Sequence, residues 1–153
     1  MQRWYPEWIV SFEIKPFGTV SGWSNILHLT ADNNVATYGD RVPSLWFHSG
    51  TTKLHICSAI NGNKNYCINP VSALALNAWT QIEITQYRNY NGDYEYQVKV
   101  GNGFTWSVVN TDPQEFTDVT VFTSDPWHPP AAAVIRKLHI DTKQRRLCHL
   151  TPL

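Results

Sequence analysis

The feature that most constrains this chain is a strict alternation of apolar and polar residues over short segments. Every second residue between positions 8 and 14 is apolar, and residues 94–100 repeat the pattern with Glu95, Gln97 and Lys99 at the polar positions. A period of two belongs to a β-strand that has one buried and one solvated face. The alternation therefore predicts strands that cover a hydrophobic core on one side.

Glycine, asparagine and proline separate these segments at short and even intervals, a spacing typical of sandwiches and barrels. Beyond the two segments above and a strand that returns from residue 63, further strands are expected at 24–30, 44–48, 53–58, 79–86, 104–109, 118–123 and 134–140. No segment favours a helix, although residues 71–78 would allow one turn. The sequence thus predicts an all-β fold of about ten strands, an antiparallel two-sheet sandwich. One domain is expected over residues 1–153, with its core at roughly 7–141 and a tail at 142–153.

Composition excludes several classes of partner. Hydrophobic residues make up 42% of the chain and charged residues 16%, and the formal net charge is zero. A nucleic-acid-binding surface would need a basic stripe, which is missing. No apolar stretch approaches the roughly 20 residues of a membrane span. The single methionine, Met1, is interpreted as a start residue placed on an excised mature domain.

The three cysteines bear on the compartment. If residues 61–63 form a three-residue hairpin loop, Cys57 and Cys67 lie directly opposite each other, close enough for a disulfide. Two half-buried thiols remain the alternative. A disulfide favours an oxidising compartment, so a secreted or extracellular location is expected. Cys148 is then unpaired or competes for one of the other two.

Three segments carry a resemblance to a known superfamily. They are residues 10–16 (VSFEIKP), 76–84 (LNAWTQIEI) and 135–140 (IRKLHI). Their order and spacing resemble concanavalin A-like (laminin G-like) jelly-roll domains over roughly residues 7–141. The resemblance implies two curved antiparallel sheets, with the first and last strands side by side. Relatives hold sugars, proteins or a calcium ion on the concave face or at one rim. The Cys57 to Cys67 hairpin and the loop at 38–43 resemble markers of a narrower animal extracellular branch.

Aromatic residues outside the expected core suggest a sugar-binding surface. Twenty aromatics, seven of them tryptophan, exceed what one core of this size needs. Sugar binding requires a flat aromatic face with planar hydrogen-bonding groups around it. The expected ligand-binding residues are Tyr38, Asp40, Arg41, Trp46, His48, His55 and Trp127. In the structural alternative, Trp46 packs between sheet and loop and Trp127 plugs an edge of the sandwich.

Calcium is the metal that the sequence favours. Asp32, Asn34 and Asp40 offer hard oxygen ligands within one loop. The same residue types also serve simply to make turns, which remains the alternative. Zinc is disfavoured because the chain has no His-x-His or Cys-x-x-Cys spacing, although His28, Trp46, His48 and His55 are expected to share one face.

These signals favour a non-enzymatic extracellular recognition module that binds carbohydrate. The alternative is a protein-interaction or structural domain of a larger extracellular protein, and an exposed edge strand would allow a homodimer. A small sandwich glycoside hydrolase is the least favoured hypothesis. It would use Glu83 and Glu95, two outward carboxylates on neighbouring strands.

Overall fold

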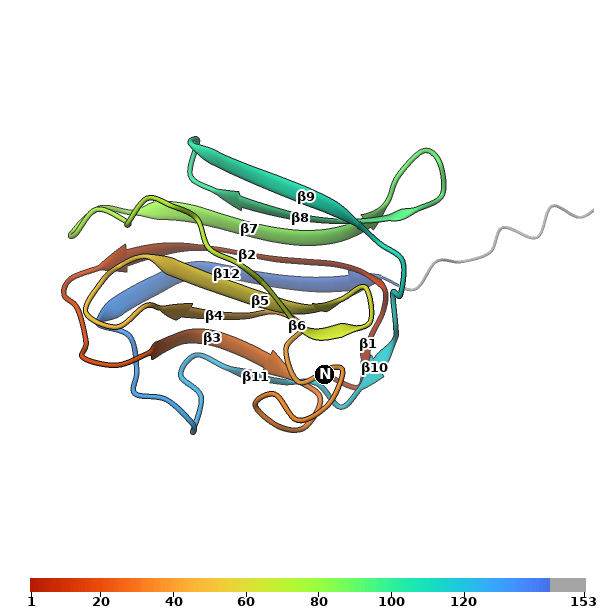
Figure 1. Ribbon diagram of the computed structural model, residues 1–153, viewed down its shortest axis with the longest axis horizontal. Coiled ribbons are helices and arrows are strands. Elements are labelled where there is room, and N and C mark those ends of the chain that lie inside the picture. Colours follow the sequence, from red (N-terminus) through yellow and green to blue (C-terminus); the bar gives the residue numbers. More distant parts are fainter. Residues whose placement is uncertain (144–153) are drawn as a thin grey trace, which may run out of the picture.

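The computed structural model of the protein describes residues 1–143 and forms an antiparallel two-sheet sandwich (Figure 1). One sheet has the order β11-β3-β4-β5-β6. Its strands are β3 (Ser24–Thr30), β4 (Ser44–Phe47), β5 (Leu54–Ile60), β6 (Asn63–Ile68) and β11 (Thr120–Phe122). The other has the order β12-β2-β7-β8-β9. Its strands are β2 (Glu7–Pro16), β7 (Thr80–Arg88), β8 (Tyr94–Val100), β9 (Phe104–Asn110) and β12 (Ala133–Lys143). Two short strands, β1 (Arg3–Trp4) and β10 (Phe116–Thr117), pair with each other.

The alternating pattern places the core between the two five-stranded sheets. Along β2 the burial alternates without a break, and Val10, Phe12 and Ile14 are fully buried. The strand expected at 134–140 is β12, which pairs with β2 as the resemblance implied. The core also reaches beyond the expected limits of 7–141, because Trp4 is fully buried and packs against Trp8 at 5.4 Å between ring centroids.

The predicted all-β class is confirmed, and the one segment where a turn of helix was considered does not form it. Within residues 1–143 no helix forms, and residues 71–78 run as bends and one turn. The described part of the chain has twelve strands instead of about ten, because β1 and β10 were too short to show an alternation. The described residues therefore include no helix that could cross a membrane.

The predicted disulfide between Cys57 and Cys67 is present, but the turn that creates it differs from the expected one. Ile60 pairs directly with Asn63, so the turn holds two residues, Asn61 and Gly62. Both have positive φ, at 56° and 71°, as a type I′ turn requires. A bulge after residue 58 then shifts the register by one and returns the two cysteines to opposite positions.

The two sheets differ in how their outer faces are covered. Strands β7 and β8 alternate between buried and partly exposed residues, whereas every residue of β3 and β4 is buried. A strand buried on both sides needs a second cover besides the core. Loops 31–43 and 123–130 supply it, and the candidate site lies on this covered face.

Candidate functional site

The outer face of β3 and β4 is polar and yet buried. His28 and Ser44 are fully buried there, and Trp46 is 2% exposed. Two hydrogen bonds from loop backbone hold one loop on this face: the amide of Asn25 donates to the carbonyl of Pro129, and the amide of residue 131 donates to the carbonyl of Asn25. Buried polar groups in folded proteins are nearly always hydrogen-bonded. Within residues 1–143, Oγ of Ser44 and Nε1 of Trp46 have no hydrogen-bond partner, whereas His28 has two.

His28 ties both covering loops to β3. Its Nδ1 lies 2.8 Å from Oδ2 of Asp125, and its Nε2 lies 2.7 Å from the carbonyl oxygen of Asp40. Burial lowers the pKa of His28, while these two contacts act in the opposite direction. Oδ1 of Asp125 accepts hydrogen bonds from the amides of Trp127 and His128, at 3.1 and 2.9 Å. The cluster therefore fixes the position of the 123–130 loop on the sheet.

Arg41 is the one guanidinium buried against this face in residues 1–143, with 8% of its surface exposed. Its Nε and Nη2 donate to the backbone and side-chain oxygens of Asn34, at 3.0 and 2.9 Å. Its Nη1 donates to Oδ1 of Asn65. The guanidinium also lies over the ring of Trp46, 4.4 Å from the centroid, in a cation–π contact. All three hydrogen-bond acceptors are thus neutral.

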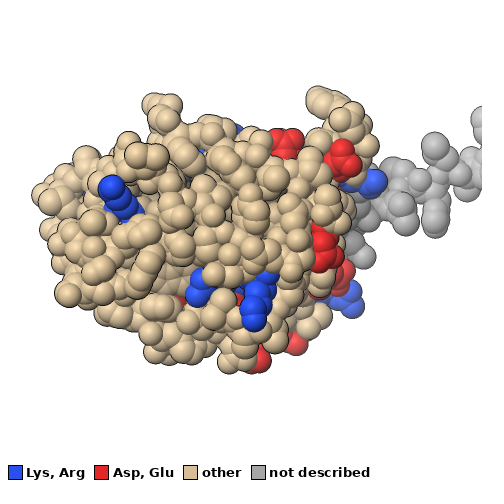
Figure 2. All heavy atoms as spheres, in the orientation of Figure 1, with Lys and Arg blue, Asp and Glu red and all other residues tan. Residues whose placement is uncertain are grey.

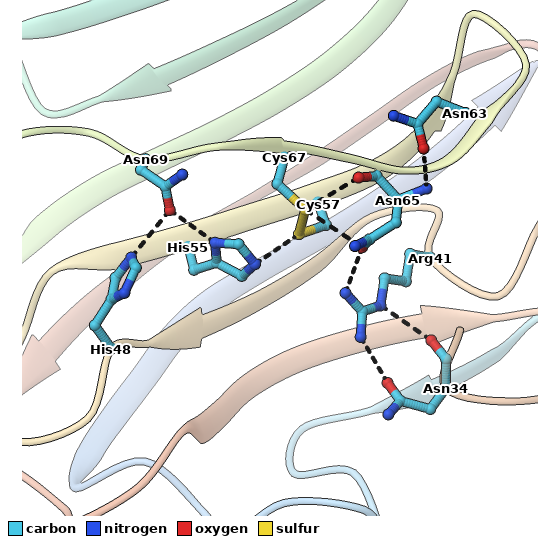
Figure 3. The surroundings of a disulfide bond; sticks show 9 residues. All are labelled: Asn34, Arg41, His48, His55, Cys57, Asn63, Asn65, Cys67 and Asn69. Atoms are coloured by element: carbon cyan, nitrogen blue, oxygen red, sulfur yellow. Dashed lines mark hydrogen bonds between the residues drawn. A yellow bond between two sulfur atoms is a disulfide. The ribbon is translucent and has the colours of Figure 1, made fainter. Parts of the chain in front are cut away.

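A row of polar side chains continues from Arg41 across β5 and β6 (Figure 3). Oδ1 of Asn69 lies 2.9 Å from Nε2 of His48 and 2.7 Å from Nδ1 of His55. Burial lowers the pKa of His55, and electrostatic interactions with His48 and Arg41 lower it further. Asn69 opposes that shift by its hydrogen bond. His55 is consequently a neutral imidazole at neutral pH, held in a fixed orientation.

The disulfide lies in the middle of this row. Nε2 of His55 is 3.1 Å from Sγ of Cys57, whose other neighbour is Sγ of Cys67 at 2.10 Å. These three residues are also the only group in residues 1–143 whose potential metal-ligating atoms lie within 4.8 Å of one another. With both sulfurs in the disulfide, they anchor β5 to β6 beneath the imidazoles.

Trp23 lies beside the two imidazoles of this row. Its ring is 42% exposed and packs 4.5 Å from the ring of His48 and 4.8 Å from that of His55. Together with four other side chains it lines an open cleft of about 190 Å³, called the polar cleft below. The lining residues of the polar cleft are Trp23, Arg41, Trp46, His55 and His128. An aromatic face beside planar polar groups is a surface that can bind the ring of a polar ligand.

Of the residues expected to bind ligand, four gather at or beside the polar cleft. Arg41, Trp46 and His55 line it, and His48 packs against His55 at 5.4 Å. Their common face follows from the pairing of Trp46 with His55, which the sequence predicted from the hairpin.

The other three expected residues lie elsewhere. Tyr38 donates to the carbonyl of Asp112, and burial together with that residue's charge raises its pKa to about 12. The carboxylate of Asp40 points into its own loop. Trp127 is 39% exposed and packs against His28, 5.2 Å away, so it covers the buried cluster beside the cleft.

The sequence reasoning missed Trp23, Asn65, Asn69 and His128. Asn69 could have been predicted from the sequence. In an antiparallel ladder that pairs residues 57 and 67, residues 55 and 69 are also opposite each other, which places Asn69 beside His55. Trp23 and His128 reach the cleft through loops, for which the strand pattern carries no signal.

The calcium ligands expected in loop 31–43 stay a prediction. The carboxylate of Asp40 accepts hydrogen bonds from the amides of Asn33 and Thr37, at 3.1 and 2.7 Å. Oδ1 of Asn34 accepts from Arg41, and Oδ2 of Asp32 accepts from the side chain of Asn33. A cation at these oxygens would have to replace those donors.

The carboxylate pair expected for a hydrolase does not form. Glu83 is opposite Lys99 and bonds to it at 3.0 Å, whereas Glu95 is opposite Tyr87. The two glutamates share the outer face of the β7–β8 pair but lie four residues apart along the strands, about 13 Å at the usual strand rise. Paired glycosidase carboxylates lie at most about 9.5 Å apart.

Comparison with known proteins gives structural likenesses alone. No protein-family model matches the chain, and no curated protein matches it. Similar solved structures include a polysaccharide lyase family 18 protein (9% identity, TM-score 0.49, covering 92% of this chain and 72% of that one). Sheep galectin-11 in complex with glycerol has 12% identity, a TM-score of 0.46 and coverage of 88% and 89%. An alginate lyase from Alteromonas sp. 272 has 12% identity, a TM-score of 0.45 and coverage of 85% and 57%.

At 9–12% identity, these likenesses concern the fold alone. They correct one expectation. Two of the structures are lyases, and the prediction that this domain is not an enzyme is corrected accordingly.

Proposed function

We propose that this domain binds carbohydrate in the polar cleft. The observation that carries the proposal is Trp23, a partly exposed indole packed against two imidazoles at the mouth of a cleft with polar walls. A sugar ring presents C–H groups on its flat side and hydroxyl groups around its edge. The indole can pack against the C–H groups, and Arg41 and the imidazoles can form hydrogen bonds with the hydroxyl groups.

The cleft is built before any ligand arrives. Asn69 fixes two imidazoles, the disulfide fixes the strands beneath them, and Asn34 and Asn65 fix the guanidinium. A ligand therefore meets side chains that lose little further freedom on binding. The disulfide supports an oxidising, secreted setting for this function. It also supports the narrower extracellular branch of the superfamily as the domain's origin.

The test compares two exposed tryptophans on opposite sheets. Trp23 is 42% exposed, and Trp79 is 36% exposed beside Arg136 and Lys15, which form cation–π contacts with it. Binding of the wild-type protein to a panel of neutral and acidic oligosaccharides is measured by calorimetry. Trp23→Ala should weaken binding about tenfold, which corresponds to 1.4 kcal/mol, and the matched control Trp79→Ala should leave it unchanged. Equal losses in both variants, or no binding by the wild type, would refute the proposal.

The same experiment can also test whether the polar cleft catalyses a reaction on the sugar. A neutral imidazole beside a guanidinium has the groups that proton abstraction next to a carboxyl group requires. The calorimetry samples should therefore also be analysed for shortened chains. Shortened products that disappear in His55→Gln would make the cleft an active site, whereas intact oligosaccharides would leave binding as its function.

A further inference from the structure

Arg41 has an unusual electrostatic position. In residues 1–143 it forms no ion pair: the seven close contacts between charged side chains involve other residues. It is nevertheless more than nine-tenths buried, and it lines the polar cleft. Buried charges in proteins are usually paired, because removing an ion from water is costly. A buried cation at the wall of an open cleft is therefore suited to an anion supplied from outside.

The nearest carboxylates are already occupied. Asp125 accepts the amides of Trp127 and His128 and faces His28, and Asp40 accepts the amides of two residues in its own loop. Both carboxylates act on Arg41 at a distance and raise its pKa against the effect of burial. Neither makes a direct hydrogen bond to the guanidinium.

Arg41 also keeps hydrogen-bonding capacity toward a ligand. A guanidinium carries five N–H groups. Nε donates one to Asn34, Nη2 donates another to the same residue, and Nη1 donates one to Asn65. One N–H on each terminal nitrogen is left over, and such N–H groups suit the two oxygens of a carboxylate or sulfate.

The other walls of the polar cleft are donors or neutral groups. None of its five lining residues is acidic. His128 faces Asp125 with Nδ1, at 3.0 Å, which turns its Nε2 away from that carboxylate. The indole nitrogen of Trp46 is buried and makes no hydrogen bond within residues 1–143. Figure 2 shows charged side chains to be sparse on the face in view, with the acidic ones gathered toward the end that holds β1 and β10.

From this arrangement we infer that the polar cleft selects acidic sugars, in which a carboxylate or sulfate pairs with Arg41 while the sugar ring packs on Trp23. The inference rests on the proposed carbohydrate binding and names the ligand class. The net charge of the chain is zero, so general attraction cannot produce such a preference. The acidic group must be recognised at the cleft itself.

Binding of an acidic sugar should also change the protonation of the cleft. Burial lowers the pKa of His55, and electrostatic interactions with His48 and Arg41 lower it further, so a bound anion opposes the electrostatic part of the shift. The charged or titratable groups on this side are His48, which follows β4, Arg41 from loop 31–43, and His128, whose Nδ1 faces Asp125 of loop 123–130. Since the anion raises the pKa of His55, binding takes up a proton, and the affinity for an acidic ligand rises as the pH falls toward that pKa.

The test uses ligands that are matched except for the acidic group. Dextran sulfate is compared with dextran, and oligogalacturonate with its methyl ester, by calorimetry on the disulfide-bonded protein. At least about tenfold tighter binding of the acidic member in either pair supports the inference, and the responding pair identifies sulfate or carboxylate. Equal binding of both members overturns the inference and leaves carbohydrate binding intact. An absence of binding to all four overturns both.

Variants locate the preference. Arg41→Gln should bring the ratio of acidic to neutral affinity close to one, whereas Arg41→Lys should keep part of it. Lys99→Gln, on the opposite sheet, should keep it fully. If Arg41→Gln fails to fold, Arg41→Lys decides: a lowered ratio of acidic to neutral affinity supports the inference, and an unchanged ratio overturns it.

Discussion

The outer faces of the two sheets carry similar polar residues, which are exposed on one sheet and buried on the other. On the β7–β8 pair the polar side chains lie in water, and their ion pairs, such as Glu83 with Lys99, have partners 33% and 45% exposed. On β3 and β4 the polar side chains lie under two loops, and the contact of His28 with Asp125 is fully buried. A polar side chain on a strand is therefore most informative where tertiary structure withdraws it from water, because it must then find a partner in the protein.

The largest effect is expected where the buried cluster is broken. Asp125→Ala removes the partner of His28 and the acceptor of two loop amides. Each buried donor that is left without an acceptor costs about 1–3 kcal/mol, so a loss of about 3 kcal/mol or more is expected. Urea unfolding followed by fluorescence should show that loss, and the smaller change Asp125→Asn should recover part of it. A loss below about 1 kcal/mol would mean that this face resembles the solvated one.

The disulfide should have the next largest effect. It spans ten residues of sequence, and the double variant Cys57→Ala/Cys67→Ala should lose about 2–3 kcal/mol because the unfolded chain regains loop freedom. Unfolding of the oxidised wild type, the reduced wild type and the double variant provides the measurement. Reduced wild type and variant should agree. A variant as stable as the oxidised protein would show that strand pairing alone holds β5 to β6.

Acid should weaken the two faces in different pH ranges. Burial, His48 and Arg41 lower the pKa of His55, so the unfolded chain binds its proton before the folded protein does. Stability then falls as the pH drops below about 6.5, by at most about 1.4 kcal/mol per pH unit, down to the folded pKa.

On the other sheet, hydrogen bonds from Lys137 and Arg136 lower the pKa of Glu13. Its contribution is present above pH 4.5 and is lost only as the pH falls through the lower folded value. Unfolding curves between pH 3 and 8 measure both ranges. His55→Gln should flatten the upper range alone, and an unchanged slope there would contradict the assignment.

The smallest effect belongs to the solvated face. Glu83→Gln breaks the exposed contact with Lys99 and should cost between about 0 and 1 kcal/mol, less at high salt. Carbohydrate binding should be unchanged, because this residue lies on the other sheet. A marked loss of binding or of any glycan-cleaving activity would indicate that the functional site lies on that face.

Some of the polar cleft followed from the sequence by strand pairing. The loop at 49–52 placed Trp46 opposite His55, and both are on the face that now lines the cleft. Tyr38 and Trp127 were predicted as aromatic residues outside the core, and they lie away from the cleft. The three-residue turn was wrong, and the cysteine pairing survived because a bulge compensated for the shorter turn.

By itself the sequence determined most of the strands, their core faces and the pairing of Cys57 with Cys67. These depend on side-chain alternation and turn chemistry, which act between neighbours along the chain. Only the tertiary structure decided that Trp23, Arg41 and His128 meet on one face. Their loops are held by contacts such as that of His28 with Asp125, 97 residues apart, and no local pattern encodes a contact over that distance.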